Sequence, residues 1–356
     1  MARICAAERA DRPWAPAPAA EAGLRLSTHP HRPAIAPLPD GIARPLWSVM
    51  IPAYNAGATL PETLACVLAQ DPGPAAMQIE VVDDCSPKED PGPLVADMGK
   101  GRVGYTRQPR NLGVAGNLTD CIRRARGRLV HLLHADDLVA PGFYARMEAA
   151  FAAEPSIGAA FCRHRFIDAD GRVLSISPLE QPSSGLLENA AERLATEQRV
   201  MTPSIVVPRA VYEAVGGFDQ RLVCAEDWEM WVRIAARYPI WYETEPLASY
   251  RMHEASNTGR HLRSGEDIRY AGLAIDLFAD HLPLEIAARA IRQAKETYAR
   301  AALRSADALL GRGDLAGAAA QAREALRLSR SWPVIAAAVR MAGRRCVRTG
   351  MREVRR

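Results

Sequence analysis

Two adjacent carboxylates follow a short apolar run in the stretch RLVHLLHADDLVAPGFY, residues 128–144. The run is typical of a buried strand, but Asp136 and Asp137 at its end repel each other and have little strand propensity. One of them could cap the helix expected after Pro141. A cap uses a single carboxylate, so the pair points to a further partner. A divalent cation is such a partner, because it prefers carboxylate oxygens.

Two more acidic pairs occur at comparable places in the chain. Asp83 and Asp84 end a second strand-like run, where a carboxylate could accept a hydrogen bond from a base N–H or a ribose hydroxyl. Glu226 and Asp227 begin the amphipathic helical stretch AEDWEMWVRIAARYP. Acids are favoured at helix N-termini in any case. A carboxylate at the rigid start of a helix is also well placed to act as a general base, and we assign that role to Asp227.

Cationic groups follow a later strand, in the stretch SYRMHEASNT. Arg251 and His253 in this stretch could reach phosphates or a metal, although a single histidine is more often structural. The chain has no Walker loop, and no GxGxxG follows a predicted strand, so a metal or cationic side chains must neutralise any bound phosphate. The sequence DADG, residues 168–171, lacks the rest of a calcium loop and predicts a hairpin turn.

The predicted elements bring these acids together. Strands alternate with helices over the first part of the chain, which indicates parallel pairing with helices on both faces of a sheet. The strands are expected at residues 47–51, 79–82, 102–108 and 128–133. Ligands of such sheets bind beyond the carboxyl ends of the strands. Both aspartate pairs lie at carboxyl ends, so they are expected to form one site.

The chain divides into three parts. Residues 1–45 are rich in Ala, Pro and Arg without apolar periodicity and predict a disordered leader. Residues 46–260 carry the α/β pattern. Residues 261–356 are predicted to be all-helical and include a pair of helices similar to one tetratricopeptide hairpin. Because such repeats need about three copies to stand alone, the extension is expected to pack on the main domain.

Composition sets the broad class. The chain has 356 residues, 48% of them hydrophobic and 24% charged, as is typical of a globular protein. No apolar run approaches the roughly 18 residues of a membrane span, and no signal-peptide core is recognisable. The seven cysteines are scattered singly, which argues for reduced thiols. We therefore expect a cytoplasmic protein.

The positive charge belongs to the C-terminal tail. Residues 321–356 carry ten arginines against two glutamates, a net of +8, whereas the whole chain has a net charge of +4. The stretch SWPVIAAAVRMAGRRCVRTGMREVRR combines apolar residues with arginines. It could lie on an anionic membrane surface, at the inner face of the membrane, or it could be a packed helix with a solvated basic end. A nucleic-acid partner is not expected.

Six stretches together resemble family 2 glycosyltransferases of the GT-A fold, and the resemblance covers roughly residues 47–258. They are, in family order, VMIPAYNAGATLPETLACVLAQ, EVVDDCSP, RNLGVAGN, LLHADDLVAPGFY, GGFDQRLVCAEDWEMWVRIA and YRMH. The resemblance implies a Rossmann-like, mostly parallel sheet with helices on both faces. It also implies an inverting hexosyl-type transferase that uses a nucleotide-sugar donor, Mg²⁺ or Mn²⁺, and a glycan or lipid-linked acceptor in bacterial surface polysaccharide assembly.

The resemblance also implies roles for individual residues. Asp227 is the catalytic base, and Asp136 and Asp137 form the metal and ribose site, with His253 as a weaker metal candidate. The expected nucleotide-binding residues are Pro52, Ala53, Tyr54, Asp84 and Asp136. The expected supporting residues are Asp83, Asn111, Asn117, Glu226 and Arg251.

Two positions depart from the family pattern, which is often Asp-x-Asp-Asp at the second acidic pair. His134 occupies the place of the first acid, and Cys85 stands where glycine is usual.

Two alternative functions remain. A sugar-nucleotide nucleotidyltransferase would carry basic residues in a glycine-rich loop after the first strand, and IPAYNAGATL has none. A non-catalytic scaffold would not need the intact acids.

Overall fold

The computed structural model describes residues 30–252 and 261–341. Its N-terminal half is a parallel sheet with strand order β3–β2–β1–β4. The strands are β1 (Trp47–Ala53), β2 (Met77–Asp83), β3 (Gly104–Arg107) and β4 (Leu129–Leu132). The connecting helices are α1 (Leu60–Leu68), α2 (Gly92–Gly99) and α3 (Gly113–Arg124). The predicted alternation of strands and helices is therefore confirmed.

Beyond β4 the sheet continues with mixed pairing. β9 runs antiparallel to both β4 and β6, and β10 runs parallel to β6. The strands of this half are β5 (Leu138–Val139), β6 (Ala159–Ile167), β7 (Val173–Ile176), β8 (Gly185–Leu186), β9 (Ile205–Pro208) and β10 (Ile240–Arg251). Its helices are α4 (Phe143–Ala153), α5 (Ala190–Thr196), the 3-10 turn η1 (Thr202–Ser204), α6 (Arg209–Val215) and α7 (Glu226–Ala235).

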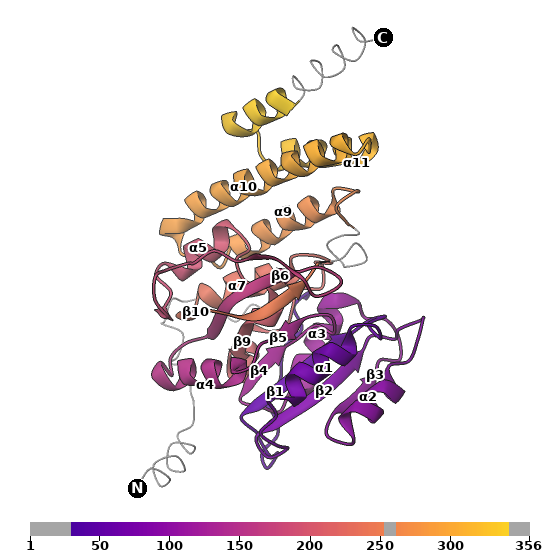
Figure 1. Ribbon diagram of the computed structural model, residues 1–356. Coiled ribbons are helices and arrows are strands. Elements are labelled where there is room, and N and C mark those ends of the chain that lie inside the picture. The colour runs from indigo at the N-terminus through magenta and orange to yellow at the C-terminus, as the bar shows by residue number, and fades with distance from the viewer. Residues whose placement is uncertain (1–29, 253–260, 342–356) are drawn as a thin grey trace.

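Helices cover both faces of the sheet because the strands are apolar on both sides (Figure 1). Along β1, Val49 and Ile51 contribute to the core beneath α1, α2 and α4. Met50, between them, points to the opposite core with α3, α6 and α7. This period of two is the geometry of a strand buried on both faces. The hairpin predicted at DADG is confirmed, because β6 and β7 pair antiparallel around it.

The segment 30–45 is packed against the second half of the sheet. Ile35 is 3% exposed and lies in the main core. The Gly217 N–H donates to the Pro33 carbonyl at 2.8 Å. The Arg32 guanidinium lies 3.1 Å from the buried Asp219 carboxylate. The prediction of a disordered leader up to residue 45 is therefore wrong for this segment, since single anchoring residues carry no periodic signal.

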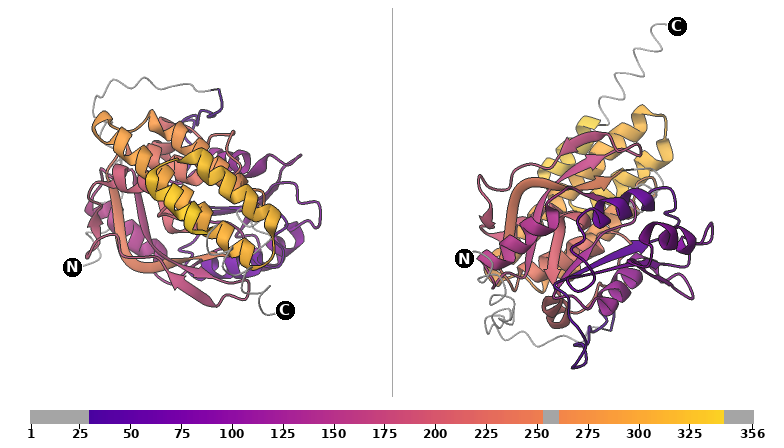
Figure 2. Two further views of the ribbon diagram at one scale, coloured as in Figure 1. Left: turned by 90° about the horizontal axis from the view of Figure 1, so that it is seen from above. Right: turned by 60° about the horizontal axis from the view of Figure 1, so that its bottom comes forward.

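The C-terminal helices stack on the second half of the sheet. They are α9 (Glu266–Ala279), α10 (Leu284–Gly311) and α11 (Leu315–Leu328), followed by a helical segment at 332–341. α9 packs on α7, and α10 packs on α5 and α9. Figure 2 shows α10 and α11 side by side. The predicted packing of the extension on the main domain is thus confirmed.

The fold class follows as predicted: an α/β sheet with helices on both faces and a helical C-terminal region. Among the helices in the described ranges, none combines the length and the apolar character that a membrane crossing requires.

Candidate functional site

A cavity of about 660 Å³ opens at the carboxyl ends of β1 and β2, and α3, α7, η1 and β10 complete its walls. The residues predicted from sequence that line it are Pro52, Ala53, Tyr54, Asp84, Asn111, Asn117, Asp136, Glu226, Asp227 and Arg251. Asp83 and Asp137 do not line it. His253 lies outside the described residues. One cavity therefore brings together side chains that are spread over about 200 residues of sequence.

Asp84 is held at the end of β2 by backbone groups. Its N–H donates to the Ala53 carbonyl at 2.8 Å, which extends the parallel ladder by one residue. Its Oδ1 accepts from the Leu112 N–H at 2.7 Å, just before α3 begins. Burial raises the pKa of the Asp84 carboxyl to about 6, although hydrogen bonds from the Leu112 and Gly113 N–H groups oppose this shift. The carboxylate thus faces the cavity with its orientation fixed.

The turn after Asp84 is tightly formed. Cys85 has φ of 57°, in the left-handed region that favours glycine. The chain therefore retains a glycine-type turn at the position where its sequence departs from the family pattern. Asp83 lies behind this turn and is fully buried. It accepts from the Ser86 N–H at 3.1 Å and pairs with the Arg107 guanidinium at 3.1 Å, so it shapes the loop instead of facing the cavity.

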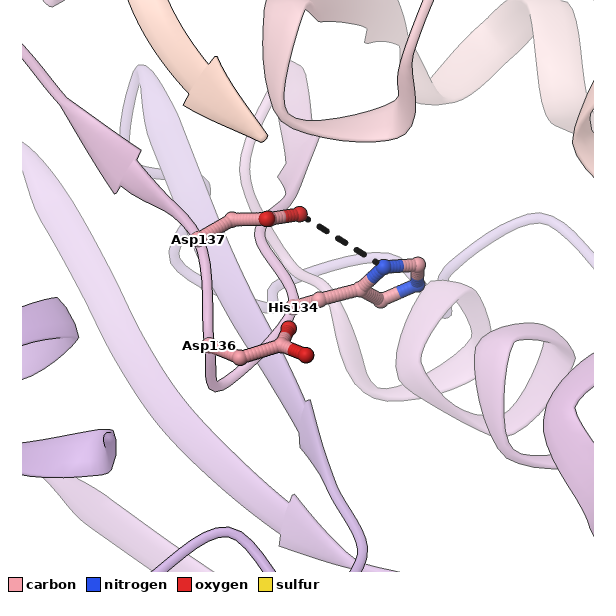
Figure 3. A group of neighbouring side chains, drawn as sticks. All are labelled: His134, Asp136 and Asp137. Carbon is pink, nitrogen blue, oxygen red and sulfur yellow. Dashed lines mark ion pairs between the residues drawn. The ribbon is translucent and has the colours of Figure 1, made fainter. Parts of the chain in front are cut away.

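His134, Asp136 and Asp137 form a cluster after β4 (Figure 3). One potential ligand atom from each lies within 4.8 Å of the others. His134 and Asp136 line the cavity, whereas Asp137 is only 1% exposed. The Asp137 Oδ1 accepts from the Arg251 N–H at 2.9 Å. Burial, together with the charge of Asp136, raises the pKa of the Asp137 carboxyl well above its usual range.

Two atoms of this cluster are buried without a hydrogen-bond partner. They are the Asp137 Oδ2, which lies 3.7 Å from the His134 Nδ1, and the His134 Nε2. An orphaned buried carboxylate oxygen is costly unless a cation or a donor satisfies it. Carboxylate oxygens and an imidazole nitrogen are also a suitable donor set for Mn²⁺ or Mg²⁺. The residues present therefore fit a divalent metal.

Arg251 links this cluster to neighbouring elements. Its Nε donates to the Asp136 carbonyl at 2.8 Å, and its Nη1 donates to the Ala169 carbonyl at 2.8 Å. Its Nη2 donates to the Glu62 carboxylate at 2.7 Å. The guanidinium is almost completely buried, so it clamps the end of β10 against the acidic loop instead of extending toward a phosphate.

Asp227 projects into the cavity from the first turn of α7. Its Oδ2 accepts from the Gln198 Nε2 at 2.8 Å and from the Thr202 Oγ1 at 3.2 Å, and its Oδ1 accepts from the Trp228 N–H at 2.7 Å. Burial raises the pKa of the Asp227 carboxyl, while the hydrogen bonds from Trp228 and Thr202 oppose that shift. A desolvated carboxylate with a raised pKa is a stronger base than a carboxylate in water.

The neighbouring acid, Glu226, also lies at the start of α7. Its carboxyl is buried with Oε2 unpartnered, and burial followed by the charge of Asp227 raises its pKa well above the usual range. Burial thus raises the pKa of both neighbouring carboxyls, so this pair holds a proton more readily than two acids in water.

Sequence reasoning missed Gln198 and Thr202 as partners of Asp227. Both lie in or near a segment, 175–200, that has no recognisable motif. The structure shows that this segment contains β8 and α5, and that α5 packs on α7. Only the three-dimensional packing brings Gln198 within hydrogen-bond distance of Asp227, since the two residues are 29 positions apart.

Comparisons with known proteins give the family. Residues 48–206 match the sequence model described as Glycosyl transferase family 2. An uncharacterized protein of Mycobacterium tuberculosis is 30% identical over 229 residues, which cover 61% of this chain and 70% of that protein. The succinoglycan biosynthesis protein ExoO of Rhizobium meliloti is 35% identical over 115 residues, which cover 32% of this chain and 30% of ExoO.

A solved structure has a similar fold. The crystal structure of S. aureus TarS 1–349 in complex with UDP-GlcNAc superimposes with a TM-score of 0.57, covering 71% of this chain and 72% of that one. The identity is 17%, so the likeness shows a shared GT-A fold alone. The matched segment 48–206 contains the predicted nucleotide pocket and the acidic cluster. With the family match and the fold in agreement, residues 48–206 belong to glycosyl transferase family 2, and the chain is a glycosyltransferase.

Proposed function

We propose that this enzyme transfers a sugar from a nucleoside-diphosphate donor to an acceptor hydroxyl with inversion at the anomeric carbon. The observation that carries the proposal is the position of Asp227. Its carboxylate lies in the same cavity as Asp84 and Asp136, and it is held by three hydrogen-bond donors. A base in the donor cavity allows direct displacement of the leaving group without a covalent intermediate.

The donor half of the reaction uses residues at the strand ends. Asp84, fixed by backbone N–H groups, would accept a hydrogen bond from the base or the ribose, and Tyr54 would cover the nucleoside. His134, Asp136 and Asp137 would hold a divalent metal. When bound, such a metal stabilises negative charge on the diphosphate leaving group. Asn111 and Asn117 support this wall: Asn117 Nδ2 donates to the Val82 carbonyl at 3.0 Å.

The acceptor half depends on Asp227. Its carboxylate takes the proton of the acceptor hydroxyl as the acceptor oxygen bonds to the anomeric carbon. The bond from that carbon to the diphosphate oxygen breaks on the opposite side, and the nucleoside diphosphate leaves with the bonding electrons. Because attack and departure occur on opposite faces, an α-linked donor gives a β-linked product.

The biological setting we propose is the assembly of bacterial surface polysaccharide or a related glycan, with a glycan or lipid-linked acceptor and a site of action in the cytoplasm. The similarity to ExoO, a succinoglycan biosynthesis protein, supports this setting. The bound UDP-GlcNAc in the TarS structure makes that sugar nucleotide the first donor to test.

A donor screen followed by product analysis tests the proposal. Thermal unfolding is measured with Mn²⁺ and a panel of sugar nucleotides that begins with UDP-GlcNAc, because a ligand stabilises the native state according to its concentration over Kd. The stabilising donor is then incubated with glycan acceptors, and NMR gives the anomeric configuration of the product. Inversion is expected. Retention of configuration, or a panel in which no sugar nucleotide binds, would overturn the proposal.

A further inference from the structure

A row of apolar side chains is exposed on the helical segment 332–341. Trp332 is 78% exposed, Val339 is 65% exposed, and Ile335 is 37% exposed. Their spacing of three and four residues places them on one side of the helix. The other side is packed: Val334 is fully buried in a cluster with residues of α10, including Leu303. The helix is therefore anchored to the protein by one side and presents a tryptophan-containing side to the surroundings.

A basic groove of about 420 Å³ runs along α10 beside this helix. Its lining includes four arginines at helical spacing and one acid, namely Arg289, Arg292, Glu296, Arg300 and Arg304. The Ser331 hydroxyl lies 3.3 Å from the Glu296 carboxylate, so the start of the exposed helix touches the groove. Arg289 pairs with Glu192, but within the described ranges no ion pair joins Arg292 or Arg304 to another residue.

We infer that these two features form one surface that docks on an anionic membrane. Tryptophan and aliphatic groups enter the boundary between headgroups and acyl chains, while arginines beside them attract anionic lipid headgroups. After Met341 the sequence adds six arginines and one glutamate, so this part of the sequence carries a net positive charge. The surface combines the apolar and the basic component that binding to an anionic interface requires.

Other occupants match only part of the surface. A second copy of the chain would present the same arginines, so that an isologous contact would bring like charges together. A polyanion in solution would pair with the arginines but would leave the Trp332 side exposed to water. None of the residues of this surface lines the donor cavity, so docking would leave the cavity accessible.

Vesicle sedimentation of the full chain tests this inference. Vesicles of phosphatidylcholine alone are compared with vesicles of equal parts phosphatidylcholine and phosphatidylglycerol, at low and high salt. Each arginine near an anionic surface contributes about fivefold in affinity. The double substitution Arg300→Gln with Arg304→Gln is expected to weaken binding about 25-fold by that estimate. Trp332→Ser with Val339→Ser should weaken it at least tenfold through the lost apolar contact.

A matched control uses an exposed arginine and an exposed apolar residue of the β6–β7 hairpin, Arg172→Gln with Leu174→Ser. The control should bind vesicles like the parent. Binding to anionic vesicles that is salt-sensitive and lost in both test variants supports the inference. Absence of binding by the parent overturns it, as does binding that neither test variant weakens. Self-association that Trp332→Ser abolishes, without vesicle binding, would assign the surface to a second copy instead.

Discussion

The two walls of the cavity hold their carboxylates in different ways. On the wall formed by β1, β2 and α3, Asp84 is fixed by main-chain groups of Ala53 and Leu112. On the wall formed by α7 and η1, Asp227 is held by the side chains of Gln198 and Thr202 as well as by the Trp228 N–H. The first arrangement follows from the path of the backbone. The second depends on side chains that a single substitution can remove.

This difference has consequences for function. A main-chain donor is lost only when its residue is replaced by proline, so the wall formed by β1, β2 and α3 should retain its geometry while its side chains vary. The base wall adjusts more easily, because its hydrogen bonds set both the orientation and the pKa of the Asp227 carboxyl. Substitutions on the two walls should therefore separate donor binding from turnover, and the predictions that follow test that separation.

The largest effect is expected at the base. Asp227→Asn retains the shape and one acceptor oxygen but cannot take a proton, so turnover should fall about a hundredfold or more. Donor affinity should remain nearly that of the parent, because the wall formed by β1, β2 and α3 is unchanged. Steady-state kinetics and calorimetric titration with the donor measure the two quantities. If donor affinity collapsed while turnover per bound donor persisted, Asp227 would be a binding residue.

The acidic cluster should affect metal-dependent binding. Asp136→Asn or Asp137→Asn is expected to weaken binding of a nucleoside diphosphate at least tenfold in the presence of Mn²⁺, because each removes an oxygen ligand of charge −1. The melting temperature without metal should not fall, since neither variant leaves an unpaired buried charge. Asp97→Asn, on the exposed side of α2, is the control. Equal stabilisation by Mn²⁺ in all of these proteins would contradict the assignment.

The location of the acids that follow β2 and β4 was predicted well from the sequence. Acids that come within a few residues of the end of a buried strand, such as Asp84 and Asp136, are expected at the carboxyl edge of a parallel sheet, and the structure places both in the cavity. Sequence spacing could not separate Asp136 from its neighbour Asp137. The chain turns between them, so that one side chain faces the cavity and the other is buried against the Arg251 N–H.

The surroundings of Asp227 were predicted only in part. Asp227 was recognisable because it begins an amphipathic helix, but its partners come from segments without periodicity. Ile35 and Arg32 were missed for a similar reason: each anchors an extended segment through contacts with distant parts of the chain. The local periodicity of apolar residues predicts strands and helices, whereas contacts between loops depend on the packing of the whole molecule.

Acid pH should weaken donor binding through Asp84. Its pKa is raised from 3.8 to about 6, so the carboxylate that accepts from the donor is lost as pH falls through about 6. Asp84→Asn should bind the donor several-fold more weakly at pH 7.5 and should show no such titration. The folded parent holds an extra proton between these two pKa values, so its stability falls as pH rises from 3.8 to about 6. Chemical denaturation of the variant should lack that slope.

A smaller change is expected from the hydrogen bonds on the base wall. The Thr202 hydroxyl lowers the pKa of the Asp227 carboxyl, so Thr202→Val should raise that pKa. Because the base works only when ionised, the acidic limb of the kcat profile should move to higher pH, while the rate above this limb stays within a few-fold of the parent. Thr202→Ser, which keeps the hydroxyl, is the control. An unchanged limb in the valine variant would show that Thr202 does not tune the base.

The smallest effect should come from the C-terminal helices. Tyr298 of α10 stacks on Trp228 of α7, with ring centroids 4.7 Å apart and planes inclined by 20°. Trp228 provides the N–H that Asp227 accepts, so α10 supports the helix that carries the base. Tyr298→Phe keeps the ring but removes a hydroxyl that hydrogen-bonds to the Gln198 main chain, so it should cost about 1 kcal/mol of stability. Tyr298→Leu should lose about 1 kcal/mol of stacking, lower the melting temperature by about 2–4 °C and reduce kcat by less than about threefold. A loss of kcat in Tyr298→Leu as large as that in Asp227→Asn would mean that the helical extension directs the chemistry. The wall that holds Asp227 would then have to include α10 as well as α7 and η1.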